Sequence, residues 1–147
     1  MLRSILGVAC FDPHFRSALF ENSTVAVRTY GVYVGEGDLT ALKLMFADKS
    51  LLTFFEAINQ GICYHPPCGP VPPGVLDIIG AALQDMSFLE ELFAHPIIAA
   101  RERGFVLHYP ETYVLTSVVH GAKRDALKKA MTDLGERIMP ITEKLAA

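Results

Sequence analysis

The chain has 147 residues, of which 51% are hydrophobic and 20% are charged, and its formal net charge is −3. A composition this apolar excludes a disordered chain. Because basic residues are not in excess, the sequence does not predict a basic surface of the kind that binds nucleic acids. The length suits one compact domain or two small ones that share a core, with apolar surface left for a partner protein or a second copy of the chain.

The first segment, residues 2–9, has apolar residues at helical spacing and only superficially resembles a signal sequence. Its apolar run stops at Asp12, and the same pattern returns at residues 78–82, so we interpret it as a structural helix. No run approaches the ~20 apolar residues that cross a bilayer. The three cysteines are too few and too widely placed for a disulfide framework. The sequence therefore predicts a cytoplasmic protein that does not associate with membranes.

The residues that follow are predicted to form short helices, separated by capping residues, prolines and glycines. Asp12 before Pro13 is typical of an N-cap with proline at the first helical position. Ser23 is the expected cap of a third helix, which Gly31 ends by providing the left-handed conformation common after helices. Residues 24–34 are also rich in strand-forming residues, but their counterparts in the second copy described below have a helical pattern, which favours a helix here.

Two further helices complete the first half, residues 1–60. One is expected from about Asp38 to Phe46. The next, capped by Asp48 or Ser50, stops at Gly61. Residues 61–74 then contain five prolines and are predicted to form a stiff, extended linker between the halves.

The remainder, residues 75–147, uses the same devices with different residues. Asp85 or Ser87 caps a helix, and Pro96 opens the next one. From residue 122 the apolar spacing describes a longer amphipathic helix, which Pro140 is expected to kink or end.

These parallels reflect an internal duplication with an offset of 73 residues. Between residues 5 and 42 the two copies align without a gap and share 11 identities, where unrelated sequences would share roughly two or three. The identical pairs are Ile5/Ile78, Gly7/Gly80, Ala9/Ala82, Asp12/Asp85, Phe15/Phe88, Leu19/Leu92, Phe20/Phe93, Ala26/Ala99, Arg28/Arg101, Gly31/Gly104 and Leu42/Leu115. The sequence thus predicts an all-α fold of two homologous halves packed with pseudo-two-fold symmetry.

The repeated pattern resembles that of nitrile-hydratase-like leader-peptide domains, and is also similar to the small alpha subunit of protocatechuate 4,5-dioxygenase. It consists of Phe15, Leu19, Ala26, Gly31, Val34, Asp38 and Leu42 in the first copy, and of Phe88, Leu92, Ala99, Gly104, Leu107, Glu111 and Leu115 in the second. The matching residues are packing and capping residues. The resemblance implies a helical module that is bound by, or caps, another protein.

One cluster of soft metal ligands interrupts the duplication. Cys63, His65 and Cys68 could supply three positions to zinc or iron, although a structural zinc usually takes four ligands. The alternative is a linker in which Cys63 packs as a small hydrophobe and His65 is solvated. We predict no cofactor, with metal binding at this loop as the alternative.

No other pattern predicts catalysis. The remaining histidines are scattered, and adjacent carboxylates such as Glu90 and Glu91 point apart on a helix. A basic cluster at residues 123–129 has the spacing of a solvated helix face. The aromatic residues assigned to the core are Phe11, Phe15, Phe20, Tyr30, Phe46, Phe54 and Phe55.

The predicted function is that of a non-catalytic module that binds a protein or peptide, as an accessory component for a partner protein or a modified-peptide pathway. The partner could also be a second copy, forming a homodimer. One alternative is an alpha-type subunit that caps the active site of a partner ring-cleaving dioxygenase. The other is a small metal-binding protein that uses Cys63, His65 and Cys68.

Overall fold

The computed structural model describes residues 2–61 and 71–146, and these residues fold into helices joined by short connections, with no strand among them. The all-α prediction is therefore confirmed. The first half consists of α1 (Leu2–Phe11), α2 (Pro13–Glu21), α3 (Ser23–Thr29), α4 (Glu36–Ala47), the 3₁₀ turn η1 (Lys49–Leu51) and α5 (Leu52–Gly61). The second consists of α6 (Pro73–Leu83), α7 (Met86–Ala94), α8 (Pro96–Glu102), α9 (Tyr109–Val119) and α10 (Arg124–Ala146).

The helix bounds follow the 73-residue offset of the sequence repeat. The ends of α7 and α8 lie 73 residues after those of α2 and α3, and α9 begins 73 residues after α4. Gly31 and Gly104, an identical pair, both have positive φ, 70° and 88°. Each glycine turns the chain after a seven-residue helix, where a side chain would strain the backbone.

Aspartate caps begin the second helix of each half. The Asp12 side chain accepts hydrogen bonds from the backbone N–H groups of His14 and Phe15, and Asp85 accepts one from Phe88. Asp85, rather than Ser87, is therefore the cap of α7. Arg103 also donates to Asp85 at 2.6 Å, a contact that Asp12 lacks among the described residues.

Several predicted boundaries are wrong by a residue or two. Asn22, rather than Ser23, caps α3 and accepts from the backbone N–H of Val25, while Ser23 is buried as the first helical residue. The fourth helix begins at Glu36 rather than near Asp38. Adjacent short polar residues are competing cap candidates, because each can accept from the backbone N–H groups of the first turn.

Two further expectations concern the last helix of each half. Asp48 caps η1, which leads directly into α5, so the aspartate rather than Ser50 acts as the cap. Of the two effects expected of Pro140, a kink or an end, the end is wrong, because α10 continues to Ala146. Pro140 has no N–H to donate to the Glu136 carbonyl, but both residues are exposed and water can satisfy that carbonyl.

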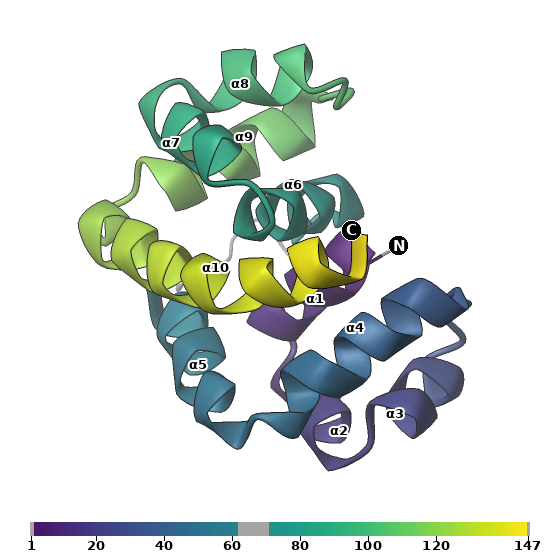
Figure 1. Ribbon diagram of the computed structural model, residues 1–147. Helices are drawn as coiled ribbons and strands as arrows, with labels where there is room; N and C mark the ends of the chain where they lie inside the picture. Colours follow the sequence, from purple (N-terminus) through teal and green to yellow (C-terminus); the bar gives the residue numbers. More distant parts are fainter. Residues whose placement is uncertain (1, 62–70, 147) are drawn as a thin grey trace.

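Helices α1 and α6, which correspond to each other in the repeat, form the centre of the molecule (Figure 1). A Cβ on Gly7 would collide with the backbone carbonyl of Leu76, and a Cβ on Gly80 would collide with that of Arg3. Arg3 and Leu76 are themselves repeat equivalents. The contact is therefore reciprocal.

The Ser4 hydroxyl donates to the Asp77 carboxylate at 2.5 Å, and these two residues are also 73 apart. A hydrogen bond between repeat equivalents places both residues beside the same point of the α1–α6 contact. The reciprocal glycine contacts lie on either side of it, one turn further along each helix.

The long helix α10 joins the halves a second time. It crosses the front of the molecule in Figure 1 and packs against its own repeat equivalent α5 as well as α4 and α6. Gly61 closely approaches Leu127, and Arg137 stacks over the Phe54 ring at 4.0 Å. Buried side chains from both halves form one hydrophobic cluster. None of the described helices is both long enough and apolar enough to cross a membrane.

Most of the aromatic residues assigned to the core are buried. Phe20, Phe46 and Phe55 form one edge-packed and stacked group with ring centroids 4.8 to 6.0 Å apart. Phe11 and Phe54 are partly buried and pack against the core. Tyr30 is 46% exposed, although its ring packs on Phe15.

The α1–α6 contact leads to a first prediction. Gly7→Ala or Gly80→Ala should lower the free energy of unfolding by about 3 kcal/mol or more, because the added methyl group meets rigid backbone rather than a movable side chain. Gly37→Ala is the matched control, since its Cβ would meet open space in the first turn of α4, and it should stabilise by about 0.5 kcal/mol. Urea denaturation measures both. Equal effects at all three glycines would show that α1 and α6 can move apart freely.

The Asp85–Arg103 contact leads to a second prediction. Partial burial raises the pKa of the Asp85 carboxyl, but hydrogen bonds from Arg103 and from the Phe88 backbone outweigh this, so the pKa is lowered. The stabilisation is therefore present above the unfolded value of about 4 and is lost as the pH falls through the lower folded value.

Asp85→Asn keeps an acceptor for the cap and removes the charge. Its free energy of unfolding should fall less steeply than that of the wild type between about pH 5 and pH 2, measured by urea denaturation at each pH. Asp12→Asn is the control, because the equivalent cap in the first half has no arginine partner in the described part of the chain. Its free energy of unfolding should keep the dependence on pH that Asp85 contributes. An unchanged slope in Asp85→Asn would mean that the ion pair has no effect on folding.

Candidate functional site

The predicted metal ligands Cys63, His65 and Cys68 lie outside the described residues, so metal binding at this loop stays a prediction. Among residues 2–61 and 71–146, no three His, Cys, Asp or Glu side chains converge as they would around a metal ion.

The remaining cysteine, Cys10, is fully buried at the end of α1. Burial raises the pKa of its thiol to about 12, although the nearby Arg16 guanidinium acts in the opposite direction. Arg16 is itself buried and donates from Nη1 to the backbone carbonyls of Ala9 and Cys10 at 3.0 and 3.3 Å. It thus satisfies the last carbonyls of α1, a structural role that the sequence pattern does not reveal. The second half has Leu89 at the equivalent position.

The histidines occupy separate positions. His14 is exposed in the first turn of α2, and His95 and His108 precede α8 and α9 without capping them through the side chain. His120 differs, because its Nε2 lies 3.2 Å from the carbonyl oxygen of Phe93. Nε2 must carry the proton for this hydrogen bond, which fixes the tautomer of the neutral ring.

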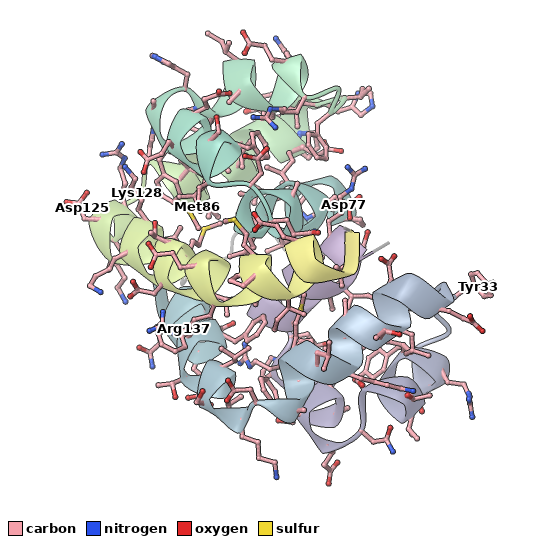
Figure 2. The ribbon with its side chains drawn as sticks, in the orientation of Figure 1. Tyr33, Asp77, Met86, Asp125, Lys128 and Arg137 are labelled. Atoms are coloured by element: carbon pink, nitrogen blue, oxygen red, sulfur yellow. The ribbon has the colours of Figure 1, made fainter. Side chains whose placement is uncertain are left out.

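The basic cluster at residues 123–129 is mostly engaged with acidic and backbone partners. Lys128 pairs with Glu90 at 2.9 Å, and Lys129 pairs with Asp133 at 2.8 Å. Arg124 donates to the Phe93 carbonyl at 2.8 Å. Lys128 and Asp125 project from the same end of α10 in Figure 2, so charges of both signs mix on this surface.

An open groove runs along α9. It has a volume of about 560 Å³. Its lining consists of Tyr109, Thr112, Tyr113, Thr116, Ser117, His120 and Gly121. All of them belong to α9 or to the turn that follows it, and we call this surface the α9 groove.

The α9 groove exposes two tyrosines on one face of the helix. Tyr109 is 81% exposed and Tyr113 is 49% exposed. With Thr116 and His120 they are spaced by four, three and four residues, which places all four on one helical stripe. The opposite face of α9 is buried through Val114, Leu115, Val118 and Val119. The helix is therefore held rigidly while its aromatic stripe faces outward.

The hydroxyl groups of the groove are oriented by the helix backbone. Thr112 donates to the His108 carbonyl at 3.0 Å, and Ser117 donates to the Tyr113 carbonyl at 2.8 Å. Because their protons are used within the helix, both oxygens can present lone pairs to the groove. The surface is therefore suited to accept hydrogen bonds beside two aromatic rings.

The stripe of the α9 groove is not repeated on α4 of the first half. The α4 residues equivalent to Tyr109, Tyr113 and Thr116 are Glu36, Thr40 and Lys43. The sequence pattern predicts packing or capping roles for Glu111 and Leu115 of α9, and this stripe was not predicted. Its signal is visible in the chain, as polar-aromatic residues at helical spacing on the face that the repeat does not preserve.

Comparison with protein-family models, with curated proteins and with solved structures gave no match.

The environment of Cys10 leads to a third prediction. In a Cys63→Ser/Cys68→Ser variant Cys10 is the remaining thiol. A pKa of about 12 rather than 9.0 lowers its thiolate fraction at pH 8 by about a thousandfold, and burial slows access further. Ellman's reagent should therefore modify the folded variant at least about a thousand times more slowly than the same variant in urea. Similar rates in both states would mean that α1 separates from the core on the timescale of the assay.

Proposed function

We propose that this protein is a binding module that receives a segment of a partner protein in the α9 groove. The observation that carries the proposal is the exposed stripe of Tyr109 and Tyr113 beside hydroxyl groups on a rigid helix. Tyrosine contributes large contact area with few rotatable bonds, which is why it is enriched where proteins bind one another.

The chemistry of the groove favours a peptide segment with free backbone N–H groups. The oxygens of Thr112 and Ser117 can accept hydrogen bonds, and the tyrosine hydroxyls can both donate and accept. An extended segment could thus place apolar or cationic side chains against the rings while its backbone meets the hydroxyl oxygens.

The resemblance to leader-peptide domains and to a small alpha subunit supports the same proposal, because both kinds of protein act through another protein. The accessory role, including the capping of a partner enzyme, belongs to this proposal. A partner seated on α9 would be placed by the second half alone, because the stripe is not repeated on α4.

The fourth prediction concerns this groove. Tyr109→Ser/Tyr113→Ser should lower affinity for the partner about thirtyfold or more, since even one aromatic anchor at an interface commonly contributes about 2 kcal/mol. The measurement uses the tagged full-length chain, recovers its co-purifying protein from the source cells, and then titrates the isolated pair.

Tyr33→Ser is the matched control. Tyr33 is 83% exposed but lies far from α9, next to the start of α4 (Figure 2). It should bind the partner as the wild type does. If the double variant also binds normally, or if the partner is lost equally in Tyr33→Ser, the α9 groove is not the binding site. Sedimentation of the isolated chain distinguishes a second copy as partner, because its mass would then depend on concentration and on the two tyrosines.

A further inference from the structure

A second hollow lies in the first half, on the side of α1 near its contact with α6. Its volume is about 240 Å³. It is lined by Ser4, Ile5, Val8, Phe15, Tyr30 and Val32. Ile5 and Phe15 form its buried floor, each 2% exposed, and the half-exposed Tyr30 stands at its mouth. We call it the α1 pocket.

The repeat shows why the pocket exists in the first half. The residue equivalent to Val32 is Phe105, whose ring stacks on Phe88 with centroids 6.1 Å apart. Phe88 is the equivalent of Phe15. The second half therefore places an aromatic ring on its buried phenylalanine at the position where the first half has only a valine.

Two cations also cover the aromatic pair of the second half. Arg3 lies over the Phe105 ring at 5.0 Å, and Arg103 lies over the Phe88 ring at 4.9 Å. The repeat equivalent of Arg3 is Leu76, in α6, and that of Arg103 is Tyr30, in the first half. The first half thus lacks both the filling ring and the covering charges, and no charged side chain lines its pocket.

The walls of the α1 pocket are suited to an aromatic ring. Phe15 and Tyr30 meet edge to face with centroids 4.6 Å apart, and Ile5, Val8 and Val32 supply apolar surface. Rings pack well against such edges and faces. A cavity of about 150 Å³ is enough to hold benzene, so 240 Å³ leaves room for a substituted or fused ring.

Ser4 sets the polarity of the ligand. Its hydroxyl donates to Asp77, so its oxygen is left as an acceptor at the edge of the pocket. A ligand with one N–H or O–H donor can use that oxygen. An anionic ligand would be repelled by the Asp77 carboxylate behind Ser4.

We propose that the α1 pocket binds a neutral aromatic ring bearing a single N–H or O–H donor, with indole and phenol as the simplest examples. The ring takes the place that Phe105 occupies in the second half, and its donor bonds to the Ser4 oxygen. It can belong to a free small molecule or to a tryptophan or tyrosine side chain of another protein. This site is separate from the α9 groove and does not depend on the function proposed for it.

The test is a titration of the full-length protein with indole, followed by the methyl NMR signals of Ile5, Val8 and Val32. These signals should shift saturably while methyl groups of the second half do not. Val32→Phe, which reproduces the second-half arrangement, should lower the affinity about tenfold or more, because its ring occupies the ligand's space.

Val106→Phe is the matched control, since it makes the same change at a residue that is 76% exposed in the other half. It should bind indole as the wild type does. Ser4→Ala should weaken indole about fivefold, the value of one hydrogen bond, but should leave indene, which has no donor, unaffected. Circular dichroism confirms that each variant is folded.

Titration with N-acetyltryptophan amide separates the two sources of the ring. Tighter binding of indole supports a free ligand, and tighter binding of the amide supports a side chain of a partner. Absence of saturable shifts in the wild-type protein overturns the proposal whatever the variants do. It is also overturned if Val32→Phe binds indole as tightly as Val106→Phe.

Discussion

The close approach of α1 and α6 is the constraint on which the rest of the structure depends. Gly7 and Gly80 let the two backbones touch, each at a carbonyl of the opposite helix, and the Ser4–Asp77 hydrogen bond lies between these contacts. Glycine is required here because any side chain would hold the helices apart. Every other helix packs, directly or through a neighbour, on this central pair, so its geometry sets the spacing of both halves.

The fold was largely predictable because local signals repeat. Aspartate caps, prolines at first helical positions and glycines after short helices mark boundaries by backbone chemistry alone. Errors arose where burial decides between candidates. Asn22 and Ser23 are equally good caps on paper, and only packing makes Ser23 the buried one. The continuation of α10 past Pro140 similarly depends on exposure, which a single sequence does not display.

The candidate sites were harder to predict, since both result from differences between the halves rather than from a motif. The stripe at Tyr109 and Tyr113 can be found in the sequence once α9 is placed and its buried face is known. The α1 pocket cannot be found in the sequence in this way. It exists because Val32 fills less space than Phe105 does at the equivalent position of the second half, and this difference becomes apparent only in the folded chain. Arg16 is a further example, since its backbone partners become apparent only when α1 and α2 are packed together.

The reciprocal α1–α6 contact also has a consequence for how the chain is made. Synthesis starts at the amino end, so α1 is complete before any residue of α6 exists. Until α6 is made, the face of α1 that carries Gly7 is uncovered. The later contact consists of the two helix backbones and the two glycines, Gly7 and Gly80. The α6 of a neighbouring nascent chain offers the same surface as its own. On a polysome, correct pairing therefore depends on the covalent continuity of one chain, which keeps its own α6 at the higher local concentration.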